Sequence, residues 1–301
     1  PHYGRKILFD LVVIGHIAKD TIIREGVKTH SVGGAPYYAG IAARKMGGKV
    51  GIVSKIGADL DDSSLSVFSE MGIQTCIRRT EGLTTSFELE YLKGLRRLKL
   101  KQTCEPILFE EVPKHFLNSR SILISPIAGE ISPIFVEKLH SESESLIAAD
   151  AQGFVRSFDS KGIAQFTFWE DAERILPLLD IVKFSKREAQ TAMNCDDIEE
   201  AAQKILNFGP EIVIITLGDE GAIIRGKENL FIKPKTPPKR VLETTGAGDI
   251  FLGVFLLEYA LTKNVANSGN IATIVATKSV EATGLSRFVT RETIEKDIQK
   301  F

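Results

Sequence analysis

Several features that would assign a protein to a particular class are scarce or missing in this sequence of 301 residues. No apolar run reaches the roughly 18 residues that suggest a membrane-spanning helix, and the early apolar stretch at 6–15 is short and contains Asp10. Thirty-eight Lys and Arg residues nearly balance 39 Asp and Glu residues, so the net charge of −1 provides no basic field for nucleic acid. We therefore expect a cytoplasmic protein that binds neither membranes nor nucleic acid.

Cysteine and metal-binding patterns are also sparse. Cys76, Cys104 and Cys195 are far apart and never form a Cys-x-x-Cys, which argues against a disulfide framework and a structural zinc site. The five histidines show no metal-ligand spacing. The sequence also lacks the Gly-x-x-x-x-Gly-Lys-Ser/Thr of P-loop kinases, and no Gly-x-Gly-x-x-Gly follows the first apolar run, as it would in a dinucleotide-binding dehydrogenase. With 43% hydrophobic residues, the length favours a globular α/β enzyme.

Apolar runs alternate with helical patterns, which predicts a mostly parallel sheet covered by helices on both faces. Buried strands are predicted at 7–14, 50–56, 121–125, 146–150, 181–183 and 212–216. Helices are predicted at 35–46, 131–141, 186–193, 198–208, 247–261, 266–282 and 291–299. A hairpin near one edge is expected from 222–225 and 230–233.

Two segments interrupt this alternation. Residues 21–32 alternate weakly, with charges on one face, and residues 86–101 read as a hairpin around Lys93 and Gly94. Both segments are expected to form exposed antiparallel strands. The second segment carries a basic run that favours a solvated edge strand over a phosphate-attracting patch: Arg96, Arg97, Lys99 and Lys101.

The most informative stretch runs from polar residues through two glycines into an apolar helix, Glu243-Thr-Thr-Gly-Ala-Gly-Asp-Ile-Phe-Leu-Gly253. Free N–H groups and the helix dipole at such a helix start suit an anion such as phosphate. Asp249 would repel that phosphate, but it could take a proton from a hydroxyl beside it. An N-cap role explains Asp249 equally well on this segment alone. We expect the helix dipole to keep its carboxylate ionised and only weakly basic.

This stretch resembles the C-terminal signature of the ribokinase (PfkB) family of carbohydrate and nucleoside kinases, in which Gly-Ala-Gly-Asp forms an anion hole with a catalytic aspartate. A second element, Gly33-Gly-Ala-Pro-Tyr-Tyr-Ala39 followed by Ala42, is similar to the family's N-terminal Gly-Gly-x-x-x-x-x-Ala element. Weaker matches follow in family order at Asp20, at 57–59 and at 216–221. The resemblance extends over nearly the whole chain.

The resemblance implies a ribokinase-like, doubly wound α/β fold with a small β lid. The core that binds nucleotide and substrate would comprise 1–16, 34–84 and 104–301, and the lid would comprise 17–33 and 85–103. Such a lid excludes water, so that the phosphoryl group is transferred and not hydrolysed. A homodimer that pairs through the lid is left open.

The resemblance also implies an activity, the transfer of a phosphoryl group from ATP, with Mg²⁺, to an alcohol group of a sugar, inositol or nucleoside. Asp249 would be the base, and Gly246, Ala247 and Gly248 would form the anion hole. Residues implied to contact the substrate are Asp20, Gly33, Gly34 and Arg156. Residues implied to contact the nucleotide are Ser185, Thr216, Gly218, Gly221, Ala276 and Gly284. Glu188 would help to hold Mg²⁺, mostly through water.

The sequence departs from the family pattern in three places. Ala35 and Pro36 stand where sugar kinases have an Asn, and Ser185 replaces the Asn of Asn-x-x-Glu. Glu243 replaces an Asp beside a loop that often binds a monovalent cation, so the binding of that cation is left open.

The strongest sequence indication of the substrate is Asp150-Ala-Gln-Gly-Phe-Val-Arg156. An arginine after the end of a core strand can reach the reaction crevice and clamp a phosphate there. This segment, together with Lys183-Phe-Ser185, resembles the inositol-kinase-like branch more than ribokinase itself. Nucleosides and other sugars are the alternative substrates.

The alternative to a kinase is a catalytically silent regulatory protein of the same fold, which binds nucleotide or sugar.

Overall fold

The computed structural model describes residues 7–92, 95–227 and 231–298. Its centre is a sheet with the strand order β15-β14-β13-β12-β9-β8-β1-β4-β5. All neighbours from β13 to β5 run parallel, and β14 pairs antiparallel with both β13 and β15. Its strands are β1 (Phe9–Ile14), β4 (Val50–Ile56), β5 (Gln74–Arg79), β8 (Ser119–Ile124), β9 (Leu146–Asp150), β12 (Ile181–Ser185), β13 (Ile212–Thr216), β14 (Ala222–Gly226) and β15 (Phe231–Ile232). The central strands read as continuous apolar runs because both of their faces are buried.

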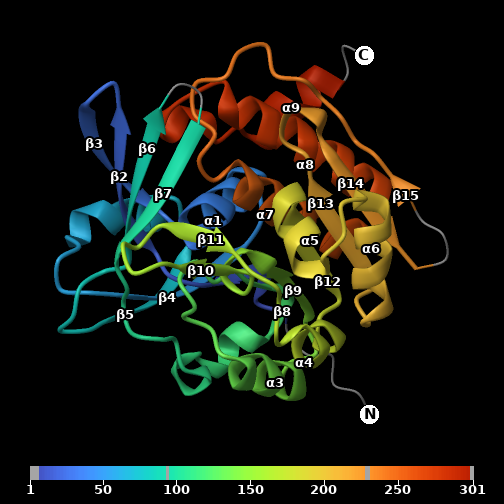
Figure 1. The fold of residues 1–301 in the computed structure, drawn as a ribbon, viewed down its shortest axis with the longest axis horizontal. Helices are drawn as coiled ribbons and strands as arrows, with labels where there is room; N and C mark the ends of the chain where they lie inside the picture. Colours follow the sequence, from blue (N-terminus) through green and yellow to red (C-terminus); the bar gives the residue numbers. More distant parts are fainter. Residues whose placement is uncertain (1–6, 93–94, 228–230, 299–301) are drawn as a thin grey trace.

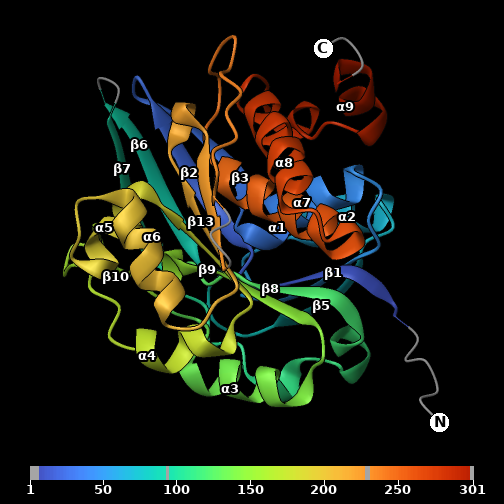
Figure 2. The same cartoon turned by 90° about the vertical axis from the view of Figure 1, so that its right-hand side faces the viewer.

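Helices cover both faces of this sheet (Figures 1 and 2). One face packs on α1 (Ala35–Lys45), α2 (Ser66–Glu70), α7 (Ala247–Thr262), α8 (Val265–Val280) and α9 (Arg291–Ile298). The other face packs on α3 (Pro133–Glu142), α4 (Ala172–Ile175), α5 (Lys186–Met193) and α6 (Ile198–Asn207). Alternate residues of β1 divide between the two cores, Leu11 and Val13 in the first and Val12 and Ile14 in the second, as the pleat of a strand requires.

A separate four-stranded sheet stands beside the core (Figure 1). Its strands, in spatial order, are β3 (Val27–Gly33), β2 (Ala18–Arg24), β6 (Ser86–Leu92) and β7 (Leu95–Gln102). We call it the lid sheet. A hairpin from the core, β10 (Arg156–Phe158) and β11 (Ala164–Phe166), lies against β7, where the Leu100 N–H donates to the Gly162 carbonyl at 2.8 Å. The Phe158 ring of β10 also faces the Phe87 ring of β6, with 6.0 Å between the ring centroids.

The structure confirms the predicted α/β class, with its mostly parallel sheet between helices. The predicted strand at 181–183 extends to Ser185, and β5, α2, α4 and the β10–β11 hairpin were not predicted. The predicted turn at Lys93 and Gly94, the hairpin position Leu230 and the helix end at Gln299 lie outside the described residues.

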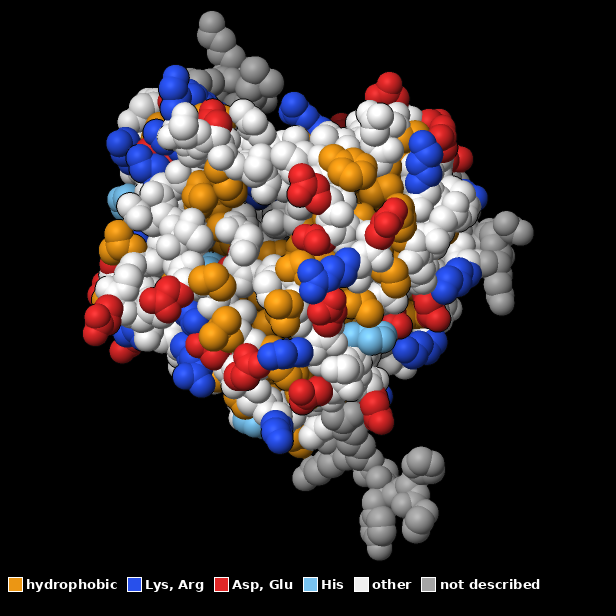
Figure 3. Space-filling view, turned by 60° about the horizontal axis from the view of Figure 1, so that its bottom comes forward, with side chains coloured by type: hydrophobic (Ala, Val, Ile, Leu, Met, Phe, Trp, Pro, Cys, Tyr) orange, Lys and Arg blue, Asp and Glu red, His pale blue; other side chains and the backbone are white. Residues whose placement is uncertain are grey.

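Within the described ranges, no helix has both the length and the apolar character needed to cross a membrane. Charged side chains of both signs are interspersed with hydrophobic ones on the face shown in Figure 3.

Gly253 allows α7 to approach α1 closely. A Cβ atom at this position would lie 2.8 Å from the backbone Cα and O atoms of Ala39. Because backbone atoms cannot move aside, Gly253→Ala should lower the free energy of unfolding by about 1–3 kcal/mol. Urea denaturation measures this loss, and Leu261→Ala, at an exposed position of the same helix, is the control that should change little. A Gly253→Ala protein as stable as the parent would show that the two helices can separate without cost.

Candidate active site

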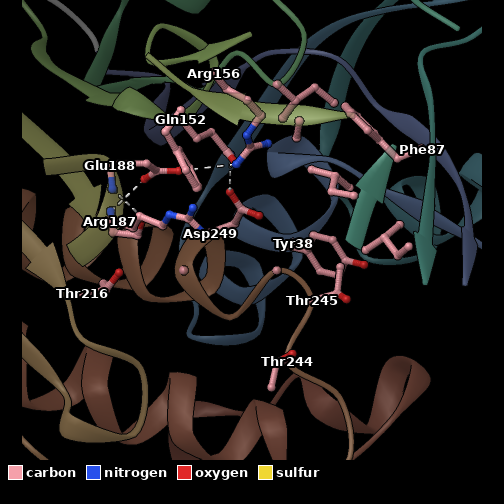
Figure 4. A pocket seen from close by; sticks show the side chains of 18 of the residues that line it. Tyr38, Phe87, Gln152, Arg156, Arg187, Glu188, Thr216, Thr244, Thr245 and Asp249 are labelled. Atoms are coloured by element: carbon pink, nitrogen blue, oxygen red, sulfur yellow. Dashed lines mark hydrogen bonds and ion pairs between the residues drawn. The ribbon is translucent and has the colours of Figure 1, made fainter. Parts of the chain in front are cut away.

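A cavity of about 970 Å³ lies between the lid sheet and the carboxyl ends of the central strands. Ligands bind in the crevice at that edge of open α/β sheets. Strands β9, β12 and β13 are neighbours in parallel register, so the residues that follow them reach the cavity together. The first turn of α5 and the start of α7 complete its floor, and Phe87, Leu89 and Leu98 of the lid sheet form an apolar roof (Figure 4).

The start of α7 is built on a glycine that no other residue could replace without strain. Gly246 is the N-cap residue and has a φ of 75°, in the left-handed region. A Cβ atom there would lie 2.3 Å from the Tyr38 ring. Gly246, Gly248 and Asp249 line the cavity. Ala247, predicted as part of the anion hole, lies outside the described lining, and its N–H donates to the Thr244 carbonyl at 3.2 Å.

Asp249 contacts a polar chain that comes from the loop after β9 (Figure 4). The Gln152 side-chain amide donates to Asp249 Oδ1 at 3.4 Å, and Arg156 Nη2 donates to Gln152 Oε1 at 3.3 Å. The same Arg156 nitrogen lies 3.4 Å from Glu188 Oε1. Arg156 therefore reaches the cavity, as the sequence predicts, but there it is paired with a buried carboxylate.

A buried ion pair lies beneath the start of α7. Lys183 of β12 stands beside Asp150 of β9 in the strand register, and its Nζ donates to Asp150 Oδ2 at 2.7 Å. The side chains are 7% and 0% exposed. A Cβ atom on Gly248 would lie 2.9 Å from Lys183 Nζ, which places this ammonium group directly against the helix start. No role was predicted for Lys183, although a lysine inside an apolar strand is a signal that could have marked it.

The surroundings of Asp249 reverse one expectation. Burial of the carboxyl, and next the negative charge of Asp150, raise the pKa of Asp249 to about 7, against the smaller opposing effects of Lys183 and Arg156. The sequence predicted a carboxylate held ionised by the helix dipole, and that prediction was wrong. Loss of water and a neighbouring carboxylate outweigh the field of the helix start.

Most other predicted site residues gather at the cavity. The described lining includes Asp20, Gly34, Arg156, Ser185, Glu188, Thr216 and Gly218. Gly33 lies outside it but packs on Asp20, because a Cβ on Gly33 would lie 2.1 Å from Asp20 Oδ2. Gly221, Ala276 and Gly284 also lie outside the described lining. Ser185 caps α5, since the Glu188 N–H donates to its Oγ and its own N–H donates to Glu188 Oε2 at 2.8 Å.

Several lining residues had no predicted role at the site. They include Phe87, Gln152, Lys183, Lys186 and Arg187. Tyr38 is buried and also lines the cavity. Arg97 of the basic hairpin is exposed yet lines it as well, so the edge-strand interpretation is incomplete for this residue.

Comparisons with known proteins agree with one another. The model of the family described as "pfkB family carbohydrate kinase" matches residues 2–291. The chain is 26% identical to a cytidine kinase of Thermococcus kodakarensis, over 84% of this chain and 89% of that protein. It is 25% identical to an inositol 3-kinase of Arabidopsis thaliana, over 92% of this chain and 76% of that protein.

Two solved structures of kinases have a similar fold. One is a pyrophosphate-dependent myo-inositol-1 kinase converted by mutation into a myo-inositol-3 kinase, with a TM-score of 0.83, 25% identity and coverage of 97% of this chain and 100% of that chain. The ribokinase from Giardia lamblia has a TM-score of 0.82 at 21% identity, covers 98% of this chain and 99% of that chain, and shows the fold.

The proton affinity of Asp249 can be measured without any substrate. Carbon-13 NMR of protein labelled at aspartate carboxyl groups should show a group that titrates near pH 7 and whose signal disappears in Asp249→Asn. Asp150→Asn removes a negative charge that raises this pKa, so the midpoint should move down toward the ordinary value of about 3.9. Asp61→Asn, at an exposed position, is the control that should leave it in place. A parent protein in which Asp249 titrates near 4 would contradict this description of the site.

Proposed function

The chain belongs to the pfkB family of carbohydrate kinases, and on that premise we propose that it transfers a phosphoryl group from ATP to an alcohol group of a small polyhydroxy substrate, with Asp249 as the base. The observation that carries the proposal is the position of Asp249. It stands in the first turn of α7, lines the cavity together with Gly246 and Gly248, and accepts a hydrogen bond from Gln152.

The pKa of Asp249 suits this role. A general base works best when its pKa lies close to the working pH, because it is then partly ionised and also binds a proton well. Burial and Asp150 raise the pKa of Asp249 to about 7. In a loose transition state, the proton of the acceptor hydroxyl leaves late, so Asp249 receives it when the new P–O bond is already forming.

Positive charge for the transferred phosphoryl group comes from three sources. The α7 start, with the positive end of its dipole, borders the cavity at Gly246 and Gly248, Lys183 lies against Gly248, and Arg156 extends from the loop after β9. The apolar roof of the lid sheet keeps water away from the same place, which favours transfer over hydrolysis. Gly246 supports this arrangement because it alone lets the helix start approach Tyr38.

The residues present fit a Mg²⁺ ion that is bound mainly through water and donor phosphates. Within the described ranges there is no group of three or more His, Cys, Asp or Glu residues that could hold a metal by themselves. Glu188 is buried, lines the cavity and offers the oxygen ligands that Mg²⁺ prefers. When bound, Mg²⁺ would neutralise charge on the phosphate oxygens. Glu188 would orient Arg156 at the same time.

The acceptor is proposed to be an inositol in preference to a nucleoside or another sugar. Gln152 and Arg156 present an amide and a guanidinium beside Asp249, and Asp20 adds a carboxylate from the lid sheet. These groups suit a ring that carries several hydroxyls. The inositol 3-kinase relative and the myo-inositol kinase structure support this order, while the cytidine kinase relative keeps cytidine in the test.

A panel of acceptors tests the proposal. Myo-inositol, cytidine, ribose and fructose are each incubated with Mg²⁺ and either ATP or pyrophosphate, and release of ADP or phosphate is measured. One acceptor should raise release well above the rate without acceptor. Asp249→Asn should reduce turnover by on the order of 10²–10⁴-fold, because the base is lost, while donor binding measured by thermal shift persists.

Two outcomes would contradict the proposal. Undiminished turnover in Asp249→Asn, compared with Asp61→Asn as the exposed control, would remove Asp249 as the base. Binding of donor and acceptor without turnover for any pair would indicate a regulatory protein that binds nucleotide or sugar.

A further inference from the structure

The lid sheet is tied to the loop that precedes α7. Arg24, the last residue of β2, donates from Nη2 to Glu243 Oε2 at 2.7 Å and from Nη1 to the Leu242 carbonyl at 3.2 Å. Its guanidinium carbon lies 4.6 Å from the centre of the Tyr91 ring, on the neighbouring strand β6. One side chain therefore joins two strands of the lid sheet to a loop of the core.

Tyr91 makes a second connection to the same loop. Its hydroxyl lies 3.0 Å from Thr245 Oγ1 and donates to Glu243 Oε1 at 3.5 Å. Thr245 directly precedes Gly246, the N-cap of α7. The lid sheet is thus hydrogen-bonded to the residue next to the proposed anion hole.

Glu243 is the centre of these contacts. It is buried, and Oε1 accepts the Thr245 N–H at 2.9 Å, so its side chain shapes the backbone immediately before Gly246. Burial by itself would raise the pKa of Glu243, but the Thr245 hydrogen bonds and the charges of Arg24 and Arg287 outweigh it, so its pKa lies below the ordinary value. Glu243 is therefore a carboxylate at neutral pH. A buried carboxylate that loses a partner is destabilised.

Arg24 is the partner that the lid sheet supplies. Arg287, a second cation that contacts Glu243, belongs to the core, and its Nη2 donates to the Glu243 backbone carbonyl at 3.3 Å. The guanidinium of Arg24 stands at the carboxylate where the sequence left a monovalent cation open. One charged partner of the Glu243 carboxylate therefore belongs to β2 of the lid sheet.

We propose that Arg24, Tyr91 and Glu243 are positioning residues that couple the placement of the lid sheet over the cavity to the formation of the anion hole at Gly246–Gly248. This inference rests on the proposed kinase function. When β2 and β6 cover the cavity, Arg24 and Tyr91 hold Glu243 and Thr245, and these fix the backbone that leads into α7. When the lid sheet moves away, Glu243 loses both contacts and the helix start loses its support. The donor then meets a complete anion hole only when water is excluded.

Kinetics of matched variants test the coupling. In Arg24→Ala and Glu243→Gln, kcat for transfer should fall by about tenfold to roughly a hundredfold, the range for a catalytic group displaced by about 1 Å, with a smaller change in acceptor KM. The ratio of donor hydrolysis without acceptor to transfer should rise. Arg24→Lys, which keeps the charge, should recover part of kcat, and Tyr91→Phe should lose less than Arg24→Ala. Lys28→Ala, at an exposed position of β3 in the same sheet, should behave like the parent.

A double variant separates coupling from independent damage. Arg24→Ala and Glu243→Gln remove the two ends of one contact, so the double variant should lose no more than the worse single variant. Fully additive losses in kcat would overturn the proposal, as would a parent-like kcat and hydrolysis ratio in Arg24→Ala.

Hydrogen exchange tests the same coupling without any substrate. In Arg24→Ala, backbone amides of β2 and β6 and those of residues 243–248 should all exchange faster than in the parent, whereas Lys28→Ala should change neither region. Faster exchange in the lid sheet alone, with residues 243–248 unchanged, would overturn the proposal. If no acceptor in the panel is phosphorylated, the proposed function fails, and hydrogen exchange still decides whether the two segments are coupled.

Discussion

The arrangement of the site depends on one buried ion pair, Lys183 with Asp150. Parallel pairing of β9 and β12 places the two residues side by side, and their nearly complete burial makes each charge dependent on the other. The ammonium group lies under Gly248, where it adds to the field of the α7 start. The carboxylate raises the pKa of Asp249. Lys183 thus favours an anion at the helix start, and Asp150 favours the protonated form of Asp249, the proposed base.

The second constraint is steric and brings α7 to this ion pair. Gly253 lets the helix lie against Ala39 of α1, and Gly246 lets its first turn pass the Tyr38 ring. Both contacts hold the helix start at the carboxyl ends of β9 and β12. The two glycines therefore allow close helix packing, and this packing places Asp249 beside Gln152. A motif of small residues specifies this site because larger residues would displace its main chain.

Sequence reasoning was most successful where a pattern is local. Strand and helix periods predicted the α/β fold, and the motif around Asp249 together with Arg156 and Thr216 predicted residues that do line the cavity. It failed for the β10–β11 hairpin, because short strands with mixed polarity acquire their pairing only from contact with β7. The pKa of Asp249 was also mispredicted. The helix dipole can be inferred from a helix start, but burial and the charge of Asp150 depend on residues about a hundred positions away in the chain.

The charges in the cavity explain why a partly protonated aspartate is useful in the proposed reaction. Lys183 is paired with Asp150 and Arg156 with Glu188, so an anionic donor meets cations that are already partly neutralised. Donor binding then brings negative charge close to Asp249, and a like charge raises the pKa of a carboxyl further. The proton affinity of Asp249 would increase at the moment when an acceptor hydroxyl must lose its proton. Lys183 and Arg156 oppose this increase, because each of them lowers the pKa of Asp249. Their opposition keeps an ionised fraction available, so the balance between the two ion pairs and the donor sets how well Asp249 can act as a base at neutral pH.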